Sequence, residues 1–235
     1  MNLHTFATAE EANAAATDLL AHWLTHDRIR TLMVAAGNTP LELYGRIATR
    51  RLALGPLDVF ALDEYVGVPV DEPRNCANLL RRSVAEAWNI PAERYHAISS
   101  DPAEALSSVR AQEQRITAAG GLDAIVLGLG QNGHLGFNEP GSDPDSTGRV
   151  LDLESISIEA NRTWFGGVHA PAQGVTVGLR TILAARRVLI LAFGSHKTAA
   201  VAAMTRGPVH PTCPASFLRQ HPDAHAFVDR AAAGF

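Results

Sequence analysis

Short apolar runs that alternate with longer helical segments constrain this sequence more than any other feature. Each run is followed by glycine or by a group of polar residues, as is usual where a strand ends. Strands that alternate with helices form a parallel sheet with helices on both faces, so the pattern predicts an α/β fold. The apolar runs are Thr31–Ala36, Val59–Leu62, Asp123–Leu129 and Arg187–Phe193.

The segments around these runs complete the expected fold. Two further short runs, Val175–Val177 and Ala224–Val228, predict strands. No internal repeat, low-complexity tract or linker interrupts the pattern, so we expect residues 1–235 to form a single domain. The predicted helices cover Thr8–Leu24, the segment from Pro40 through Ile47, the segment through Leu79 and Ala85, Pro102–Ala118 and Lys197–Met204.

Charge and apolar content exclude several classes of partner. The net charge is −4 and the lysines and arginines are scattered, so we expect no nucleic-acid partner. The longest apolar runs are far shorter than the ~20 residues that cross a membrane, and the N-terminus lacks the pattern of a signal peptide. The two cysteines, Cys76 and Cys213, are far apart and are expected to be reduced thiols in a cytoplasmic protein.

Metal and nucleotide motifs are missing from the sequence. None of its ten histidines belongs to an HExxH motif, and there is no paired CxxC. His221 and His225 have helical spacing, but Pro222 lies between them, so we expect no required metal. Gly128 and Gly130 begin a GxG pattern without a following helix, which fits a dinucleotide fingerprint poorly.

Polar groups gather where four of the predicted strands end. The ligand crevice of an open α/β sheet lies outside the carboxyl ends of its strands, so we expect these groups to meet in one active site. The four segments are Gly37-Asn38-Thr39-Pro40, Asp63-Glu64, Gly130-Gln131-Asn132-Gly133-His134 and Gly194-Ser195-His196-Lys197.

Two of these segments have the character of an anion site. The turn Gly37–Thr39 presents backbone N–H groups at the start of a helix, where a phosphate binds readily. An ordinary strand-to-helix turn is the alternative. Lys197 opens another helix, and its ammonium group could reach a phosphate, unless it is an ordinary solvated lysine.

The other two segments carry acid–base groups. Asp63 and Glu64 offer two carboxylates, one of which could act as a general base, with helix capping or a salt bridge as the alternative. His134 and Glu139 lie five residues apart in a glycine-rich loop and together could move a proton near neutral pH. A lone histidine is more often structural, but Asn132 adds a further polar group to this loop.

Four sequence blocks resemble those of glucosamine-6-phosphate deaminases, in the same order and spacing over nearly the whole chain. The second and third blocks separate the deaminases from the related 6-phosphogluconolactonases, whose loop reads DGH followed by a different tail. The later stretches VTVGLRTILAARRVLIL and PASFL are closer to the galactosamine-6-phosphate isomerase subgroup. The blocks are AGNTPLELY (Ala36–Tyr44), LDEYVGVP (Leu62–Pro69), GLGQNGHLGFNEPGS (Gly128–Ser142) and FGSHK (Phe193–Lys197).

This resemblance implies a Rossmann-like parallel sheet, no cofactor, and conversion of a 2-amino-2-deoxyhexose 6-phosphate and water to a ketohexose 6-phosphate and ammonia. By position, Asp63 resembles the base that moves a proton from C2 to C1. His134 resembles the residue that assists opening of the sugar ring, with Glu139 as its carboxylate partner. Lys197 and the turn Gly37–Thr39 match phosphate-binding positions. Such a reaction needs a carboxylate base at C1 and C2, an acid–base group at the ring oxygen and a phosphate anchor in one place.

The sequence departs from the family pattern in three places. Asn132 stands where the deaminases usually have Asp, so either Glu139 supplies the carboxylate for His134 or the substrate or step differs. The phosphate-binding arginine of the family falls in the segment NRTWF, where Arg162 is displaced by one position. The chain is shorter than the larger, allosteric members, so we expect hyperbolic kinetics and a structural role for Arg149, which matches a position tied to allostery.

Two alternative functions stay open at this point. The first is hydrolysis of a sugar-acid phosphate lactone, with His134 activating water. The second is a non-catalytic sugar-phosphate sensor, which Asn132 favours. The sequence fixes neither the C4 epimer of the substrate nor the oligomeric state, and a homo-oligomer is compatible with it.

Overall fold

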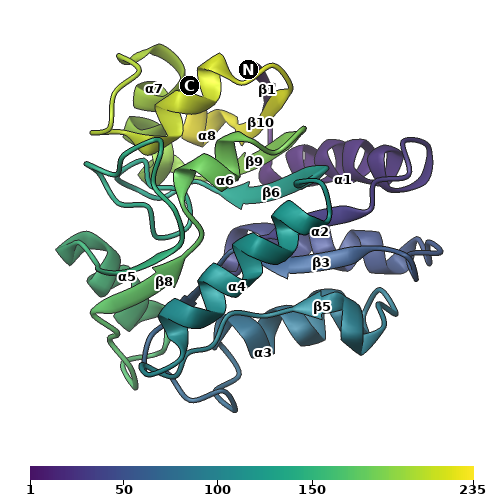
Figure 1. The fold of residues 1–235 in the computed structure, drawn as a ribbon. Coiled ribbons are helices and arrows are strands. Elements are labelled where there is room, and N and C mark those ends of the chain that lie inside the picture. The colour runs from purple at the N-terminus through teal and green to yellow at the C-terminus, as the bar shows by residue number, and fades with distance from the viewer.

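A seven-stranded sheet forms the centre of the computed structural model, which describes all 235 residues (Figure 1). Every neighbouring pair of strands in this sheet is parallel. The α/β fold and its mostly parallel sheet are therefore confirmed, and five of the six predicted apolar runs overlap strands of this sheet. In spatial order the strands are β1 (Asn2–Phe6), β10 (Ala224–Asp229), β9 (Val188–Ala192), β6 (Ala124–Gly128), β2 (Thr31–Val34), β3 (Asp58–Ala61) and β5 (Tyr95–His96).

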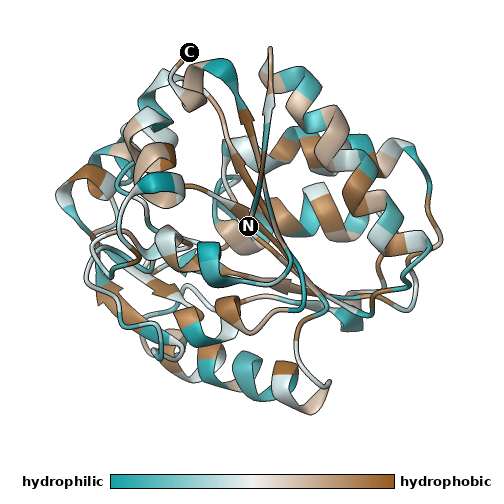
Figure 2. Ribbon diagram, turned by 90° about the horizontal axis from the view of Figure 1, so that it is seen from above, coloured by the Kyte–Doolittle hydropathy of each residue, from teal (hydrophilic) through white to brown (hydrophobic).

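Helices cover both faces of this sheet, as Figure 2 shows from above. On one face pack α1 (Ala9–Thr25), α2 (Asn38–Thr49), α3 (Cys76–Leu80) and the π-helical turn η1 (Arg81–Glu86). On the other face pack α4 (Ala105–Ala118), α6 (Leu179–Leu183), α7 (Thr198–Arg206), the 3₁₀ helix η4 (Pro214–Gln220) and α8 (Arg230–Ala233).

The strands are apolar on both faces because they divide their side chains between two cores. In β2, Leu32 and Val34 belong to the core under α1 and α2. Met33, between them, belongs to the core under α4 and α7. All three side chains are fully buried, and each such burial contributes roughly 1.5–3 kcal/mol. The short, unbroken apolar runs of the sequence therefore reflect a sheet that is covered on both sides.

A second, antiparallel sheet lies beside the first and changes the setting of one predicted segment. Its strands, in order, are β4 (Asp63–Tyr65), β8 (Gln173–Thr176) and β7 (Arg149–Asp152). The sequence pattern places Asp63 and Glu64 just after the predicted strand Val59–Leu62. In the structure the chain leaves the large sheet at Leu62 and these residues form β4 instead. Pairing with β8 fixes the backbone of Asp63.

The remaining elements are short or lie at the surface. No helix is both long and apolar enough to cross a membrane. These elements are the 3₁₀ turns η2 (Ala92–Arg94) and η3 (Ser195–Lys197) and the helix α5 (Ser155–Trp164).

Candidate active site

A cavity of about 590 Å³ opens at the edge of the large sheet where β2, β6 and β9 end. Residues from all four strand-end segments identified in the sequence line it. The structure thus brings these segments together, in the position where open α/β sheets bind ligands. Of the residues singled out from the sequence, Gly37, Asn38, Thr39, Asp63, Asn132, His134 and Lys197 line the cavity.

The N-terminus of α2 forms one wall of the cavity. Its first residues, Asn38 and Thr39, line the wall, and no side chain caps this helix end. Gly37 precedes the helix with φ of 106°, a conformation that glycine adopts without strain. The uncapped N–H groups and the positive end of the helix dipole together favour an anion in front of this turn.

Lys197 faces the same cavity from η3. Its Nζ donates to the backbone oxygen of Leu129 at 2.6 Å, and no carboxylate lies within ion-pair distance of it. Burial lowers the pKa of Lys197 because the charged form loses water. A partly buried ammonium group without a counter-ion is stabilised by a bound anion, so Lys197 adds a second anion-binding group to the cavity.

Asp63 presents a carboxyl group that makes no hydrogen bond to the protein. It is 8% exposed and lines the cavity. Burial, with the neighbouring charge of Glu64 adding to it, raises the pKa of Asp63 to about 8. A carboxylate whose pKa is raised in this way is a stronger base than an ordinary aspartate, so Asp63 has the properties of a general base.

Glu64 plays a different part from its neighbour. Its side chain is fully buried and accepts hydrogen bonds from the backbone N–H groups of Ala77 at 2.8 Å, Tyr65 at 2.7 Å and Cys76 at 3.1 Å. Burial raises the pKa of Glu64 to about 7, although these hydrogen bonds oppose the shift. Glu64 therefore takes the helix-capping role, at the start of α3, that the sequence left open for either carboxylate.

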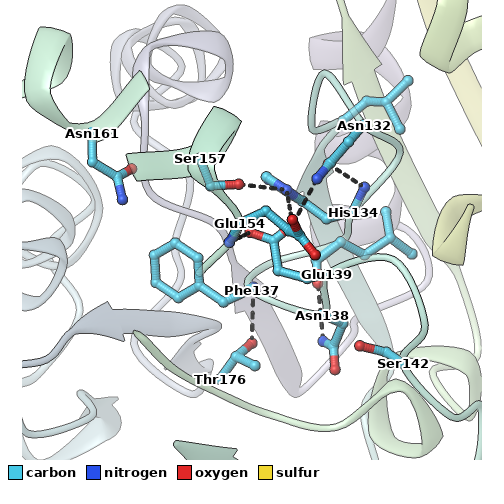
Figure 3. A network of polar contacts seen from close by, with 12 residues as sticks. Asn132, His134, Phe137, Asn138, Glu139, Ser142, Glu154, Ser157, Asn161 and Thr176 are labelled. Atoms are coloured by element: carbon cyan, nitrogen blue, oxygen red, sulfur yellow. Dashed lines mark hydrogen bonds and ion pairs between the residues drawn. The ribbon is translucent and has the colours of Figure 1, made fainter. Parts of the chain in front are cut away.

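A hydrogen-bonded group of three side chains lies at the loop after β6 (Figure 3). The Oε2 atom of Glu139 lies 3.2 Å from Nδ1 of His134 and accepts from Nδ2 of Asn132 at 2.7 Å. Burial would raise the pKa of Glu139, but His134 and the hydrogen bonds of Ser157 and Asn132 hold it at about 2. Glu139 is thus the charged partner of His134, and Nε2 of the imidazole is left for a ligand.

Asn132 orients the carboxylate of Glu139 rather than the imidazole. Its Nδ2 binds Glu139, and its Oδ1 accepts from the backbone N–H of His134 at 3.3 Å. The ring of His134 packs over Gly130, where a Cβ atom would overlap it. The carboxylate beside His134 is therefore that of Glu139, which agrees with the first of the two explanations offered for Asn132 in the sequence.

Arg149 lies outside the cavity wall. Its guanidinium donates to Oδ1 of Asn138 and to the hydroxyl of Ser142, each at 2.8 Å. Asn138 is fully buried and donates in turn to the backbone oxygens of Leu135 and Val177. These contacts tie the loop after β6 to the small sheet, in keeping with the structural role expected for Arg149.

Arg162 is the one predicted phosphate-binding residue that does not line the cavity. Its side chain is 58% exposed and its Nε lies 3.7 Å from Glu159 on the outer side of α5. Helical periodicity explains the difference, because the face of α5 that lines the cavity is set by positions three or four apart. These positions are Ile156, Ser157, Ala160, Asn161, Thr163 and Trp164.

Several residues of the cavity wall escaped the sequence analysis. Ser157, on α5, lies 3.5 Å from Nδ1 of His134. Tyr65, at the end of β4, donates to Oδ1 of Asn161 at 3.1 Å, which joins the small sheet to α5. Arg74 comes from the turn before α3. The spacing of Ser157 and Asn161 is a weak helical signal, and nothing in the sequence marks Arg74.

Together, the fold and the site define an α/β protein with an acid–base group beside an anion-binding turn. A family model described as glucosamine-6-phosphate isomerases/6-phosphogluconolactonase matches residues 5–227. The chain therefore belongs to this family, which confirms the resemblance read from the sequence.

Relatives of similar length carry one common name. The chain is 38% identical over 230 residues to a glucosamine-6-phosphate deaminase of Rhodopirellula baltica, which covers 95% of this chain and 91% of that protein. It is 33% identical over 234 residues to a protein of the same name from Leuconostoc citreum, with 99% of each chain covered. The similarity thus spans the whole site.

Solved structures agree with the fold. A structure described as a monomeric glucosamine-6-phosphate deaminase matches with a TM-score of 0.94 and 29% identity, covering 100% of this chain and 99% of that one. A 6-phosphogluconolactonase from Trypanosoma brucei matches with a TM-score of 0.80 and 21% identity, covering 99% and 97%. The second likeness shows a shared fold alone.

Proposed function

We propose that this protein is an enzyme that converts a 2-amino-2-deoxyhexose 6-phosphate and water into a ketohexose 6-phosphate and ammonia. One observation carries the proposal: the unpaired carboxyl group of Asp63 and the imidazole of His134, which Glu139 contacts, face a single cavity that also contains an anion-binding turn. The names of the relatives, at 33% and 38% identity over nearly the whole chain, support it.

Binding begins with the phosphate. The uncapped turn Gly37–Thr39 and the ammonium group of Lys197 would hold it at one end of the cavity. Anchoring at the phosphate fixes the sugar relative to the acid–base groups, and such positioning removes a large part of the entropic cost of the reaction.

Ring opening is the task of His134. Its imidazole takes the proton of the C1 hydroxyl and returns it to the ring oxygen, which gives the open-chain aldose. Glu139, whose pKa is held at about 2, stays charged and stabilises the protonated imidazole during the transfer. Asn132 keeps that carboxylate in place through its hydrogen bond of 2.7 Å.

Isomerisation is the task of Asp63. Its carboxylate takes the proton from C2, and the electron pair forms the C1–C2 double bond of an enolamine as O1 takes a proton from water. Asp63 then returns its proton to C1, while the nitrogen gives up a proton to water and becomes an imine at C2. Water adds to C2 and ammonia leaves, so that no cofactor and no redox partner enters the balance. We therefore propose that the enzyme uses no cofactor and no metal.

The whole chain serves this reaction, and we propose that residues 1–235 act as one domain. Segments from Gly37 to Lys197 contribute to one cavity. Both cysteines, Cys76 and Cys213, are buried free thiols, which supports a reducing compartment, and we place the enzyme in the cytoplasm.

Ammonia release tests the proposal directly. The protein is incubated with glucosamine 6-phosphate and, separately, with galactosamine 6-phosphate, and ammonia and ketohexose 6-phosphate are measured together. We expect both products in equal amounts from at least one substrate, and none with Asp63→Asn. Hydrolysis of 6-phosphogluconolactone without any ammonia would establish the lactonase function instead. Binding of both amino sugars without turnover would establish a sensor.

A further inference from the structure

The cavity needs a second cation for a doubly charged phosphate, and Arg162 does not supply it. Arg162 lies on the outer side of α5 beside Glu159. One lysine and one arginine line the cavity, Lys197 and Arg74. Arg74 belongs to the turn between β4 and α3, which the sequence marks only as a loop rich in proline.

Arg74 is held against Trp164, at the end of α5, by three contacts. Its Nη1 donates to the backbone oxygen of Trp164. Its guanidinium carbon lies 5.4 Å from the centre of the indole ring. The Nε1 atom of Trp164 donates back to the backbone oxygen of Arg74 at 3.3 Å. The turn and the helix are thus joined at the cavity, and the guanidinium group has a defined position.

The charge of Arg74 has no partner in the protein. No carboxylate lies within 4.0 Å of its guanidinium group, in contrast to Arg162. The nearest acid in the sequence, Glu72, accepts instead from the backbone N–H of Arg74 at 3.2 Å and lies 3.7 Å from His169. One hydrogen-bond donor of the guanidinium group contacts Trp164, so most of its five donors are available to a ligand.

We propose that Arg74, and not Arg162, is the arginine that binds the phosphate of the substrate, and that Trp164 positions it. This assignment rests on the proposed function, because it concerns the same cavity. A guanidinium group binds phosphate through two parallel hydrogen bonds, which a lysine cannot do. Its guanidinium carbon lies over an indole ring and its Nη1 is hydrogen-bonded to Trp164, so the group is already oriented and loses little freedom on binding. Binding would also tie α5 to the turn across the substrate.

A binding assay that needs no turnover tests the assignment. Glucitol 6-phosphate carries the phosphate but has no carbonyl group and cannot be isomerised. Its Kd is measured by calorimetry for the wild type and for Arg74→Ala, Arg74→Lys and Arg162→Ala, with glucitol as the ligand that lacks phosphate. We expect Arg74→Ala to raise the Kd at least tenfold, Arg74→Lys to raise it by a smaller factor, and Arg162→Ala to change it less than twofold.

Three results would overturn the assignment. The first is a Kd of Arg74→Ala within twofold of the wild-type value. The second is an equal rise in Kd for Arg162→Ala. The third is an equal loss of affinity of Arg74→Ala for glucitol and for glucitol 6-phosphate. Arg74 is exposed at the surface, so the variant is expected to fold, and thermal melting checks this. If Arg74→Ala has a lowered melting temperature, the Kd values of Arg74→Gln and Arg74→Lys decide, since both keep an unbranched polar side chain.

The ammonia assay separates this inference from the proposed function. If the wild type releases no ammonia and Arg74→Ala loses glucitol 6-phosphate binding, the proposed reaction is refuted and Arg74 remains the phosphate ligand. If the wild type releases ammonia and Arg74→Ala binds glucitol 6-phosphate as well as the wild type does, the role of Arg74 is refuted and the proposed reaction stands.

Discussion

Replacing Asp63 with asparagine is expected to abolish isomerisation and at the same time to stabilise the fold. Asp63 is 8% exposed and accepts no hydrogen bond, so burial of its charged form is not compensated. Its pKa is about 8 in the folded protein, against an ordinary value of 3.8. The folded state therefore binds a proton that the unfolded state has already released at neutral pH.

The sign and size of the effect follow from this difference. Between pH 4 and pH 8 the folded state holds more protons than the unfolded state, so this side chain lowers the free energy of unfolding as the pH rises, by about 1.4 kcal/mol per pH unit. The loss is about 2 kcal/mol at pH 5 and about 4 kcal/mol at pH 7. Asparagine cannot ionise and is free of this loss, so Asp63→Asn should gain stability by these amounts.

Urea unfolding of the wild type and Asp63→Asn at pH 5, 6 and 7 measures the difference. We expect the gain in the free energy of unfolding to increase with pH, while ammonia release is lost and glucitol 6-phosphate binding is kept. Glu64→Gln, which removes the neighbouring buried carboxylate that caps α3, is compared for ammonia release alone, because its own raised pKa gives a pH dependence of stability of the same sign. Equal pH dependence in the wild type and Asp63→Asn, or a less stable variant at pH 7, would refute the reasoning.

Three further substitutions test the other parts of the site. Glu139→Gln should lower kcat by roughly 10²–10³ because His134 loses its charged partner, with an unchanged Kd for glucitol 6-phosphate; a wild-type kcat would contradict this. Lys197→Met should raise that Kd by a factor of about 10 or more, as calorimetry can show, and an unchanged Kd would exclude Lys197 from the phosphate site. Gly130→Ala should lower kcat because the new methyl group overlaps the imidazole ring; full activity with an unshifted melting temperature would argue against that packing.

The sequence predicts those parts of the fold whose residues are buried on both sides. Strands β2, β6 and β9 are continuous apolar runs, because helices cover both of their faces. Strand β1 lies at the edge of the sheet and exposes three of its five residues, so it has no such pattern. Helix α5 is missed for a related reason, because only Ser157 and Asn161 of its ten residues are buried.

The residues of the candidate site likewise fall into those that the sequence predicts and those that it does not. Asp63, His134 and Lys197 follow strands, and the ends of parallel strands must meet at one edge, so their convergence could be predicted. The position of Arg162 depends on the phase of a helix whose start is not visible in the sequence. Arg74 reaches the cavity from a turn, and its contact with Trp164 joins residues 90 positions apart. No local pattern records such a contact.

The change of direction at Leu62, where the chain leaves the large sheet, separates phosphate anchoring from the proposed general base. The proposed anchors of the phosphate on Gly37 and Lys197 are fixed to the large sheet, while Asp63 is carried by the small sheet. Residues of β4 and β8 can therefore change without altering these two anchors. A scaffold divided in this manner can exchange one reaction for another and keep its substrates phosphorylated, which suits a family that includes both isomerases and lactonases.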